Sequence, residues 1–252
     1  MAGQMTLFNL MDDTPDLYKI HNKVRLIELF AGIGSQAMAL KRLGVDFEHY
    51  RCVEYNKYPV MSYNAIHGTD FKPTDITKLS GEDLGIVDTD KYTYIMTYSF
   101  PCQDLSLSGK QKGMSKGSGT RSGLLWEVER LLNECKELPQ ILLMENVIQV
   151  HDDKNIDDFE KWREYLTDKG YTNFLQDLNA KNYGVAQSRT RAYMVSILGN
   201  ANYVFPEPIN LNYVMEDYLQ DESEIEEKYY LKSKKVTDFL QKLKDDNKLN
   251  NV

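Results

Sequence analysis

A Pro-Cys step at residues 101 and 102 has the clearest chemical potential in this sequence. The preceding residues 94–98, Tyr-Ile-Met-Thr-Tyr, predict a buried strand because they are rich in β-branched and aromatic side chains. Pro101 ends that strand, so Cys102 is expected at the carboxyl edge of a sheet, where open α/β sheets bind ligands. A thiol there becomes a nucleophile when nearby positive charge lowers its pKa. An inert, buried cysteine is the alternative, and it fits a Pro-Cys step before a basic loop poorly.

Glu145 and two arginines are the other polar residues expected at this edge. Glu145 follows the apolar residues 141–144, which predict a strand. If Cys102 and Glu145 end neighbouring strands, the strand spacing of about 5 Å brings a thiol and a carboxyl around one small ring. Arg189 and Arg191 project to the same side of an extended segment and can donate to a polar ligand. A salt-bridged glutamate and exposed arginines are the structural alternatives.

A glycine-rich turn at residues 32–37, Gly-Ile-Gly-Ser-Gln-Ala, follows a predicted strand and opens a predicted helix. Glycines there permit a tight turn and the close approach of a dinucleotide or a related ligand. Glu54 lies 20 residues beyond Gly34, placed to accept hydrogen bonds from ribose hydroxyls. The pattern predicts a nucleoside-containing ligand without identifying the nucleoside. A nicotinamide-dependent oxidoreductase stays open at this point, as do glycines that serve packing alone.

Alternating strands and helices must position these residues. Strands are predicted at 24–30, 47–53, 92–98, 141–144, 171–178 and 193–198, and helices at 36–43, 56–68, 124–135 and 156–169. This alternation predicts an α/β fold, with a mostly parallel sheet covered by helices on both faces. We expect a loose arm over residues 1–22, a catalytic domain over 23–200, and an acidic extension over 201–252 that contains a helix near 232–243.

The composition is that of an ordinary globular protein. The chain has 252 residues, of which 42% are hydrophobic and 27% are charged, enough for one domain with a small appendage. No apolar run approaches the roughly 20 residues of a membrane helix. The N-terminus has no basic start followed by an apolar core, so a cytoplasmic protein is expected. Three cysteines without CxxC spacing argue against a disulfide framework and against a zinc site.

The net charge of −8 by itself argues against a nucleic-acid partner. The charge is unevenly distributed, however. Seven acids lie between Glu216 and Glu227, whereas residues 110–121 carry four positive charges and no acid. We interpret the acidic run as a solvated face. The basic loop, with its glycines and serines beside Cys102, is expected to clamp phosphate.

Five motifs occur in an order that resembles the DNA cytosine-5 methyltransferases. They are Phe-Ala-Gly-Ile-Gly at 30–34, Phe-Pro-Cys-Gln at 100–103, Ser-Gly-Lys-Gln-Lys-Gly at 108–113, Met-Glu-Asn-Val at 144–147 and Gln-x-Arg-x-Arg at 187–191. The resemblance implies a Rossmann-like, S-adenosylmethionine-dependent methyltransferase fold. It also implies methyl transfer to carbon 5 of a cytosine flipped out of double-stranded DNA. An oxidoreductase would leave the Pro-Cys step, Glu145 and the paired arginines unexplained.

The resemblance assigns roles to individual residues. Cys102 matches the nucleophile that attacks carbon 6, and Glu145 matches the carboxyl that binds ring nitrogen 3 and the exocyclic amine. Arg191, supported by Arg189, matches the cation at the cytosine carbonyl oxygen. The residues expected to contact DNA or to belong to the loop that closes over it are Gln103, Ser106, Lys110, Lys112 and Arg121.

The same resemblance implies a binding site for S-adenosyl-L-methionine. Glu54 matches the ribose ligand, Tyr55 an aromatic wall for adenine, and Asp75 the acceptor for the adenine amino group. The remaining expected cofactor-binding residues are Phe30, Gly32, Gly34, Pro101 and Leu124. No catalytic position matches Cys52 or Cys135, which we interpret as packing residues.

Family members normally continue with a variable target-recognition region and two further motifs, one of which packs against the cofactor pocket. This chain ends soon after Arg191, too early for such a region. We therefore expect the catalytic part of a methyltransferase from a restriction-modification system, completed by a second subunit or a missing C-terminal region. An inactive remnant or a non-catalytic DNA-modification subunit is the alternative, and an RNA substrate is a variant of the first hypothesis.

Overall fold

The computed structural model describes residues 17–106, 109, 111–230 and 232–246. These residues divide into two compact units, one ending at Asn210 and the other beginning at Leu211. Within the described ranges, no helix has the length and apolar character needed to cross a membrane. The first unit carries every candidate site residue that the structure describes.

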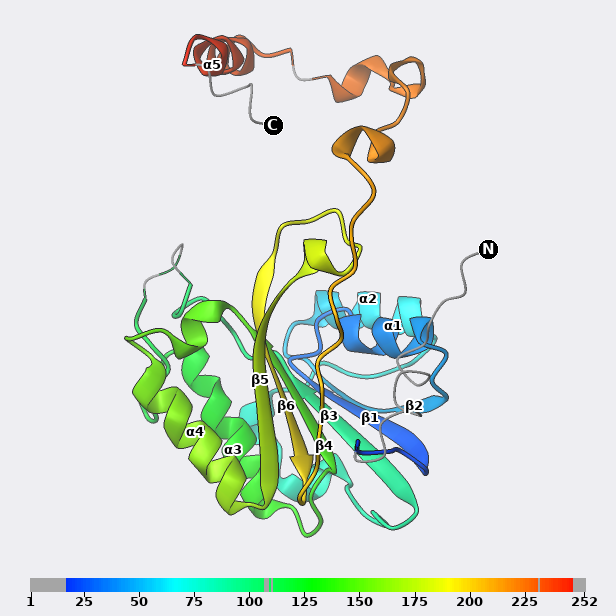
Figure 1. Ribbon diagram of the computed structural model, residues 1–252, viewed down its shortest axis with the longest axis vertical. Helices are drawn as coiled ribbons and strands as arrows, with labels where there is room; N and C mark the ends of the chain where they lie inside the picture. The colour runs from blue at the N-terminus through cyan, green and yellow to red at the C-terminus, as the bar shows by residue number, and fades with distance from the viewer. Residues whose placement is uncertain (1–16, 107–108, 110, 231, 247–252) are drawn as a thin grey trace. The chain divides into compact units, whose positions relative to one another are not determined.

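Six strands form one sheet in the first unit (Figure 1). They are β1 (Lys23–Leu29), β2 (Phe47–Val53), β3 (Tyr92–Tyr98), β4 (Ile141–Asn146), β5 (Tyr171–Asn179) and β6 (Thr190–Leu198), in the spatial order β2-β1-β3-β4-β6-β5. Strands β1 to β4 pair in parallel, whereas β6 is antiparallel to both β4 and β5. Only β6 is reversed, so the predicted α/β fold with a mostly parallel sheet is confirmed.

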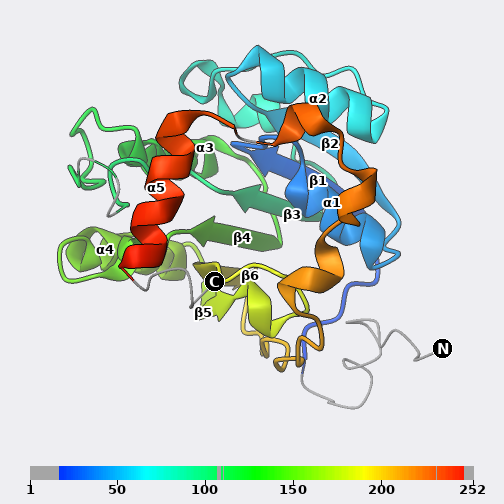
Figure 2. The ribbon, with the colours of Figure 1, turned by 90° about the horizontal axis from the view of Figure 1, so that it is seen from above.

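Four helices cover the sheet: α1 (Ser35–Arg42), α2 (Lys57–His67), α3 (Leu125–Glu134) and α4 (Ile156–Asp168). Figures 1 and 2 show α1 and α2 on one side of the sheet and α3 and α4 on the other. Trp162 of α4 is fully buried, and its Nε1 donates to Tyr98 Oη of β3 at 3.1 Å. Helix α2 begins and ends as predicted, because the Asn56 side chain accepts from the Tyr58 amide and Gly68 adopts a φ of 69°.

Two strand boundaries differ from the prediction by more than one residue. Strand β4 extends through Glu145 and Asn146, which pair with Tyr193 and Ala192 of β6. Glu145 therefore lies within a strand rather than after it, and β6 begins before Arg191. The polar side chains suggested a loop, but backbone pairing between two strands far apart in sequence keeps both segments extended.

The second unit is considered by itself. It contains three short 3-10 turns, Met215–Tyr218, Glu222–Glu224 and Glu227–Tyr229, and the helix α5 (Lys234–Asp245). All seven acids between Glu216 and Glu227 are exposed, as expected of a solvated surface. Helix α5 corresponds to the helix predicted near residues 232–243.

Candidate active site

Cys102 follows β3, and Glu145 lies near the end of the neighbouring parallel strand β4. Tyr98 of β3 pairs with Met144 of β4, so the register brings the loop that leads to Cys102 beside Glu145. Asn146 is 2% exposed, and its Nδ2 donates to the Phe100 carbonyl oxygen at 3.0 Å. This buried hydrogen bond ties the loop before Cys102 to the strand that carries the carboxylate. The strand ends thus lie side by side, as the sequence predicts.

A turn and a buried serine hold the backbone around Cys102. The amides of Leu105 and Ser106 both donate to the Cys102 carbonyl oxygen, at 3.0 and 2.9 Å. The fully buried Ser122 donates through Oγ to the Pro101 carbonyl oxygen at 2.6 Å. Cys102 itself is partly buried and packs against the hydrophobic core. The backbone before the thiol is therefore held by a tertiary contact, and the backbone after it by a local turn.

Glu145 forms an ion pair with Arg191, whose Nε lies 3.3 Å from Glu145 Oε1. The two side chains are 23% and 20% exposed, so both still reach solvent. Arg189 and Glu145 line the same groove. The structure thus gathers one carboxylate and two guanidiniums in a region that is only partly desolvated, where charge-assisted hydrogen bonds to a ligand are stronger than in water.

Three of the residues expected to contact DNA border one cavity of about 460 Å³. Gln103, Lys112 and Arg121 line this cavity together with Asp104. The Arg121 amide donates to Asp104 Oδ2 at 2.8 Å, which joins the two ends of the loop. Ser106 is partly buried in the turn after Cys102. Lys110, which the sequence also suggested, lies outside the described residues.

The basic loop is anchored to α3, which the sequence did not reveal. Lys116 Nζ lies 2.7 Å from Glu129 Oε1, so an acid outside the loop pairs with one of its four cations. Trp126 Nε1 donates to the carbonyl oxygen of the fully buried Met114 at 2.7 Å. The loop is free of acids in sequence, yet Lys116 forms an ion pair with a helix.

The turn between β1 and α1 contains three residues with positive φ: Phe30 (57°), Gly32 (55°) and Gly34 (82°). Such a φ is unfavourable for a bulky residue like Phe30, and strain of this kind often marks a functional site. A Cβ on Gly32 would meet no atom within 4 Å, whereas one on Gly34 would lie 2.3 Å from His67 Nε2. Gly32 therefore suits the close approach of a ligand, and packing against α2 accounts for Gly34.

Three further expected cofactor residues lie on the segments that follow β2. Glu54 accepts hydrogen bonds from the Gly32 amide at 3.1 Å and the Asn56 amide at 2.8 Å. Tyr55 is 76% exposed. Asp75 Oδ1 accepts from the Thr77 hydroxyl and amide, and these hydrogen bonds lower the pKa of the Asp75 carboxyl. The carboxylates of Glu54 and Asp75 and the exposed ring of Tyr55 thus all lie on the segments after the carboxyl end of β2.

A largely apolar groove of about 830 Å³ runs along the sheet face beside α1. Its wall includes Leu40 and Leu43 of α1, Ile95 of β3, Leu143 of β4 and Val195 of β6. Glu145, Arg189, Phe30, Gly32 and Ser99 line the same groove. The groove therefore extends from the candidate catalytic residues Glu145 and Arg189 to an open apolar surface on the sheet.

Comparison with known proteins identifies the family. A family model described as C-5 cytosine-specific DNA methylase matches residues 24–251. The chain belongs to this family. The type II methyltransferase M2.ScrFI of Lactococcus lactis subsp. cremoris is 34% identical over 85% of this chain and 72% of that protein. The orphan methyltransferase M.SssI of Spiroplasma monobiae is 35% identical over 71% of this chain and 61% of its own length.

A solved structure supports the fold independently. The Entamoeba histolytica methyltransferase EhMeth matches with a TM-score of 0.66 at 18% sequence identity, covering 84% of this chain and 64% of that one. At this identity the likeness concerns the fold alone. The predicted family and the predicted methyltransferase fold are thus both confirmed, and the chain spans less than two thirds of M.SssI and of EhMeth.

Several structurally important residues gave no functional signal in the sequence. Asn146 and Ser122 hold the segment just before Cys102, as described above. Glu28 is fully buried in β1, where it accepts from Tyr63 Oη at 2.5 Å, and burial raises the pKa of its carboxyl. The only sequence signal for Glu28 was structural, an acid between the apolar residues Ile27 and Leu29. The described residues contain no cluster of three or more acids, histidines or cysteines that could hold a metal ion.

The two cysteines assigned to packing differ from Cys102 in their surroundings. Burial raises the pKa of the Cys52 thiol to about 12 and that of Cys135 to about 11. A thiol with such a pKa is almost entirely protonated near neutral pH and is a poor nucleophile. Both cysteines are therefore suited to packing rather than to covalent chemistry.

Proposed function

We propose that this chain is the catalytic part of a DNA cytosine-5 methyltransferase, with residues 23–200 as its catalytic domain. One observation carries the proposal: the loop leading to Cys102 and the strand with Glu145 are neighbours, joined by the Asn146–Phe100 hydrogen bond. Membership of the C-5 cytosine-specific DNA methylase family supports the reaction type. The Glu145–Arg191 pair supports recognition of a polar ring at the same place.

The polar groups around the β1–α1 turn fit S-adenosylmethionine, which supplies the methyl group when bound. Glu54 can accept from ribose hydroxyls, because its carboxylate lies beside the Gly32 amide at the edge of the turn. Tyr55 offers an exposed ring face to adenine. Asp75 can accept from the adenine amino group, since its hydrogen bonds to Thr77 favour the ionised carboxylate. Pro101 and Leu124 are proposed to wall the methyl donor.

The chain's own side chains would activate the cytosine. Cys102 Sγ attacks carbon 6, and the electron pair of the C5–C6 double bond moves to carbon 5, which thereby becomes a nucleophile. Glu145 holds a proton at ring nitrogen 3 and accepts from the exocyclic amine, while Arg191 and Arg189 donate to the carbonyl oxygen. After carbon 5 is methylated, its proton leaves to a base and the carbon–sulfur bond breaks, which regenerates the thiolate.

We further propose that a segment or subunit outside this chain completes the enzyme by recognising the target DNA. The chain spans only 61% of M.SssI, and its net charge of −8 suits DNA binding poorly. The apolar groove beside α1 provides a surface that such a segment could cover, since an exposed apolar patch of this kind marks an interaction site.

A covalent trapping experiment tests the nucleophile. Duplex DNA that contains 5-fluorocytosine cannot lose a proton from carbon 5, so the enzyme should stay linked to it after methyl transfer. The chain is mixed with this DNA and labelled S-adenosylmethionine, with and without a polypeptide that supplies a target-recognition region, and the products are separated under denaturing conditions. The wild-type chain and the Cys135→Ser control should form the linked product, and Cys102→Ser should not. A linked product from Cys102→Ser, or none from any variant, contradicts the proposal.

A further inference from the structure

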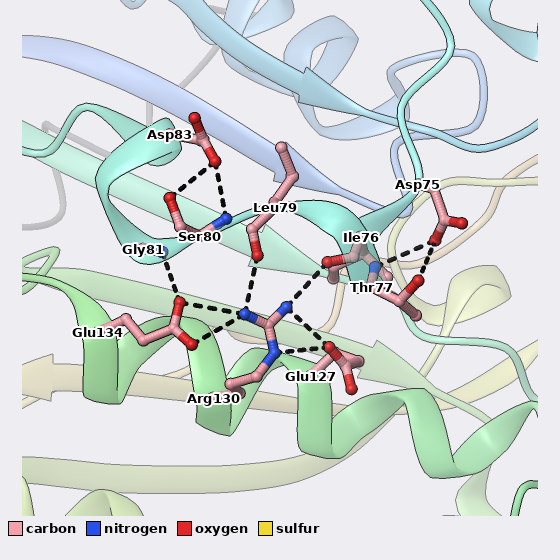
Figure 3. Close-up of polar contacts among 10 residues, drawn as sticks. All are labelled: Asp75, Ile76, Thr77, Leu79, Ser80, Gly81, Asp83, Glu127, Arg130 and Glu134. Atoms are coloured by element: carbon pink, nitrogen blue, oxygen red, sulfur yellow. Dashed lines mark hydrogen bonds and ion pairs between the residues drawn. The ribbon is translucent and has the colours of Figure 1, made fainter.

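Arg130 of α3 connects that helix to the loop that follows Asp75 (Figure 3). Its guanidinium donates to the Ile76 carbonyl oxygen at 3.1 Å and to the Leu79 carbonyl oxygen at 2.8 Å. These carbonyl groups belong to residues more than 50 positions away in sequence. A side chain on α3 therefore fixes the backbone of a loop to which sequence analysis assigned a cofactor contact.

Two carboxylates of α3 orient the guanidinium. Glu127 Oε2 accepts from Arg130 Nε at 2.8 Å, and Glu134 accepts from Nη1 at 3.0 and 3.1 Å. Glu134 Oε2 also accepts from the Gly81 amide at 2.8 Å, which adds a third hydrogen bond from α3 to the same loop. The planar guanidinium bridges two carbonyls and two carboxylates at once. The point charge of a lysine cannot reproduce this geometry.

The loop held by Arg130 determines how Asp75 is presented. Asp75 Oδ1 accepts from both the amide and the hydroxyl of Thr77. Asp75 Oδ2 accepts no hydrogen bond from the described residues and lies 3.8 Å from Lys78 Nζ. The Ile76 carbonyl between Asp75 and Thr77 is one of the two that Arg130 holds. The Ile76 carbonyl and the Thr77 amide belong to one peptide, so rotation of that peptide would also move the Asp75 carboxylate.

The same arginine lies beside another proposed wall of the cofactor site. Arg130 and Leu124 line one cavity of about 720 Å³ on α3 and the basic loop. Arg130 is one third exposed, so its charge is only partly screened by solvent. It thus contacts the loop that follows Asp75 and lines the same cavity as the residue proposed to wall the methyl donor.

We propose that Arg130 is a positioning residue that directs Asp75 toward the 6-amino group of adenine and thereby sets the base specificity of the cofactor site. The inference rests on the proposed function, because it takes the cofactor to be S-adenosylmethionine and Asp75 to be its adenine ligand. Arg130 makes no contact with the cofactor in this proposal. Its effect passes through the backbone of residues 76–79.

The test compares the product of the cofactor with an analogue whose base carries an oxygen in place of the 6-amino group. S-adenosylhomocysteine carries the 6-amino group, and S-inosylhomocysteine carries a carbonyl oxygen that a well-placed Asp75 carboxylate repels. Their dissociation constants are measured by calorimetry for the wild-type chain and for Arg130→Lys. The wild type should prefer the adenosyl compound. In Arg130→Lys that affinity should fall by about tenfold, a typical effect of losing a charge-assisted hydrogen bond, while the affinity for the inosyl compound should change by less than about twofold.

Arg163 of α4 provides a matched control. It pairs with Glu160 at the same i, i+3 spacing, and the contacts described for its side chain do not include residues 75–81. Arg163→Lys should therefore leave the ratio of the two affinities unchanged. Glu134→Gln keeps Arg130 but weakens the hydrogen bonds that Glu134 accepts from Arg130 and from the Gly81 amide. It should therefore lower the preference for the adenosyl over the inosyl compound by a smaller factor than Arg130→Lys does. It also serves as the second variant if Arg130→Lys does not fold.

Asp75→Asn separates the inference from a general loss of structure. It should abolish the preference for the adenosyl compound, and adding Arg130→Lys to it should have little further effect, because both residues act on the same contact. An unchanged ratio in Arg130→Lys, or an equal loss of affinity for both compounds, overturns the role of Arg130. A wild-type chain that binds neither compound overturns the proposed cofactor site itself.

Discussion

Replacing Asn146 by alanine tests whether one buried hydrogen bond positions the loop that leads to Cys102. The Asn146 side chain is 2% exposed, donates to the Phe100 carbonyl oxygen and accepts from the Val147 amide at 2.8 Å. Among the described residues, no other donor reaches that carbonyl oxygen. Alanine leaves both backbone groups buried without these partners, at about 1–3 kcal/mol each, so the free energy of unfolding should fall by about 2–6 kcal/mol.

Urea unfolding followed by tryptophan fluorescence measures this loss. Both tryptophans, Trp126 and Trp162, lie on helices of the same unit, and Trp162 contacts Tyr98 of β3 directly. Asn173→Ala is the control, because the Asn173 side-chain amide donates to Thr167 Oγ1 in a more exposed place. This substitution should lower the free energy of unfolding by less than about 1 kcal/mol.

Methyl transfer provides the second readout. Below the unfolding transition, the Asn146 variant should transfer methyl groups at least about tenfold more slowly, because the loop that leads to Cys102 is no longer tied to the strand that carries Glu145. A stability loss below about 1 kcal/mol would show that the loop finds other partners. Undiminished transfer by a destabilised variant would show that this hydrogen bond does not position Cys102.

Two further predictions concern the packing behind the glycine turn. Gly34→Ala should lower the free energy of unfolding by about 2 kcal/mol or more, because its Cβ would collide with His67 in addition to the strain of its positive φ. Gly44→Ala, with a similar φ and no atom within 4 Å of the new Cβ, should cost only about 1 kcal/mol; equal urea midpoints for the two variants would contradict the collision. Burial and the nearby cations lower the pKa of His49 from 6.5 to about 4. Between pH 4 and pH 6.5 the unfolded chain therefore binds more protons than the folded chain. The free energy of unfolding should fall by about 1–2 kcal/mol as the pH drops from 6.5 to 4, after allowance for solvent screening. His49→Gln should remove this part of the pH dependence, and an unchanged pH profile of the urea midpoint would refute it.

The sequence predicted most elements of the fold because their signals are local. Strands β2 and β3 match the predicted residues 47–53 and 92–98, and helix α2 has the predicted cap and terminal glycine. An apolar run, a capping asparagine and a glycine at the end of a helix each act within a few residues of one another. The order of the five motifs is also visible in the sequence itself, and it predicted the correct family.

The reversed strand β6 was not predicted, because its direction depends on pairing with β4 and β5 rather than on its own residues. The same pairing placed Glu145 within a strand. The glycine turn shows what the sequence alone could not decide. Sequence alone left ligand contact and packing open for both glycines, and the surroundings of each Cα separated Gly32 from Gly34.

By itself, the sequence determined the strand and helix pattern, the family, and the position of Cys102 in the loop that follows a strand. Only the tertiary structure decided which partner each charged residue takes. Lys116 pairs with Glu129, Glu145 with Arg191, and Arg130 holds the loop after Asp75. These partners are 13 to 54 residues apart in sequence. A contact across such a distance leaves no periodic pattern in the chain, because it exists only once the sheet has brought the two segments together.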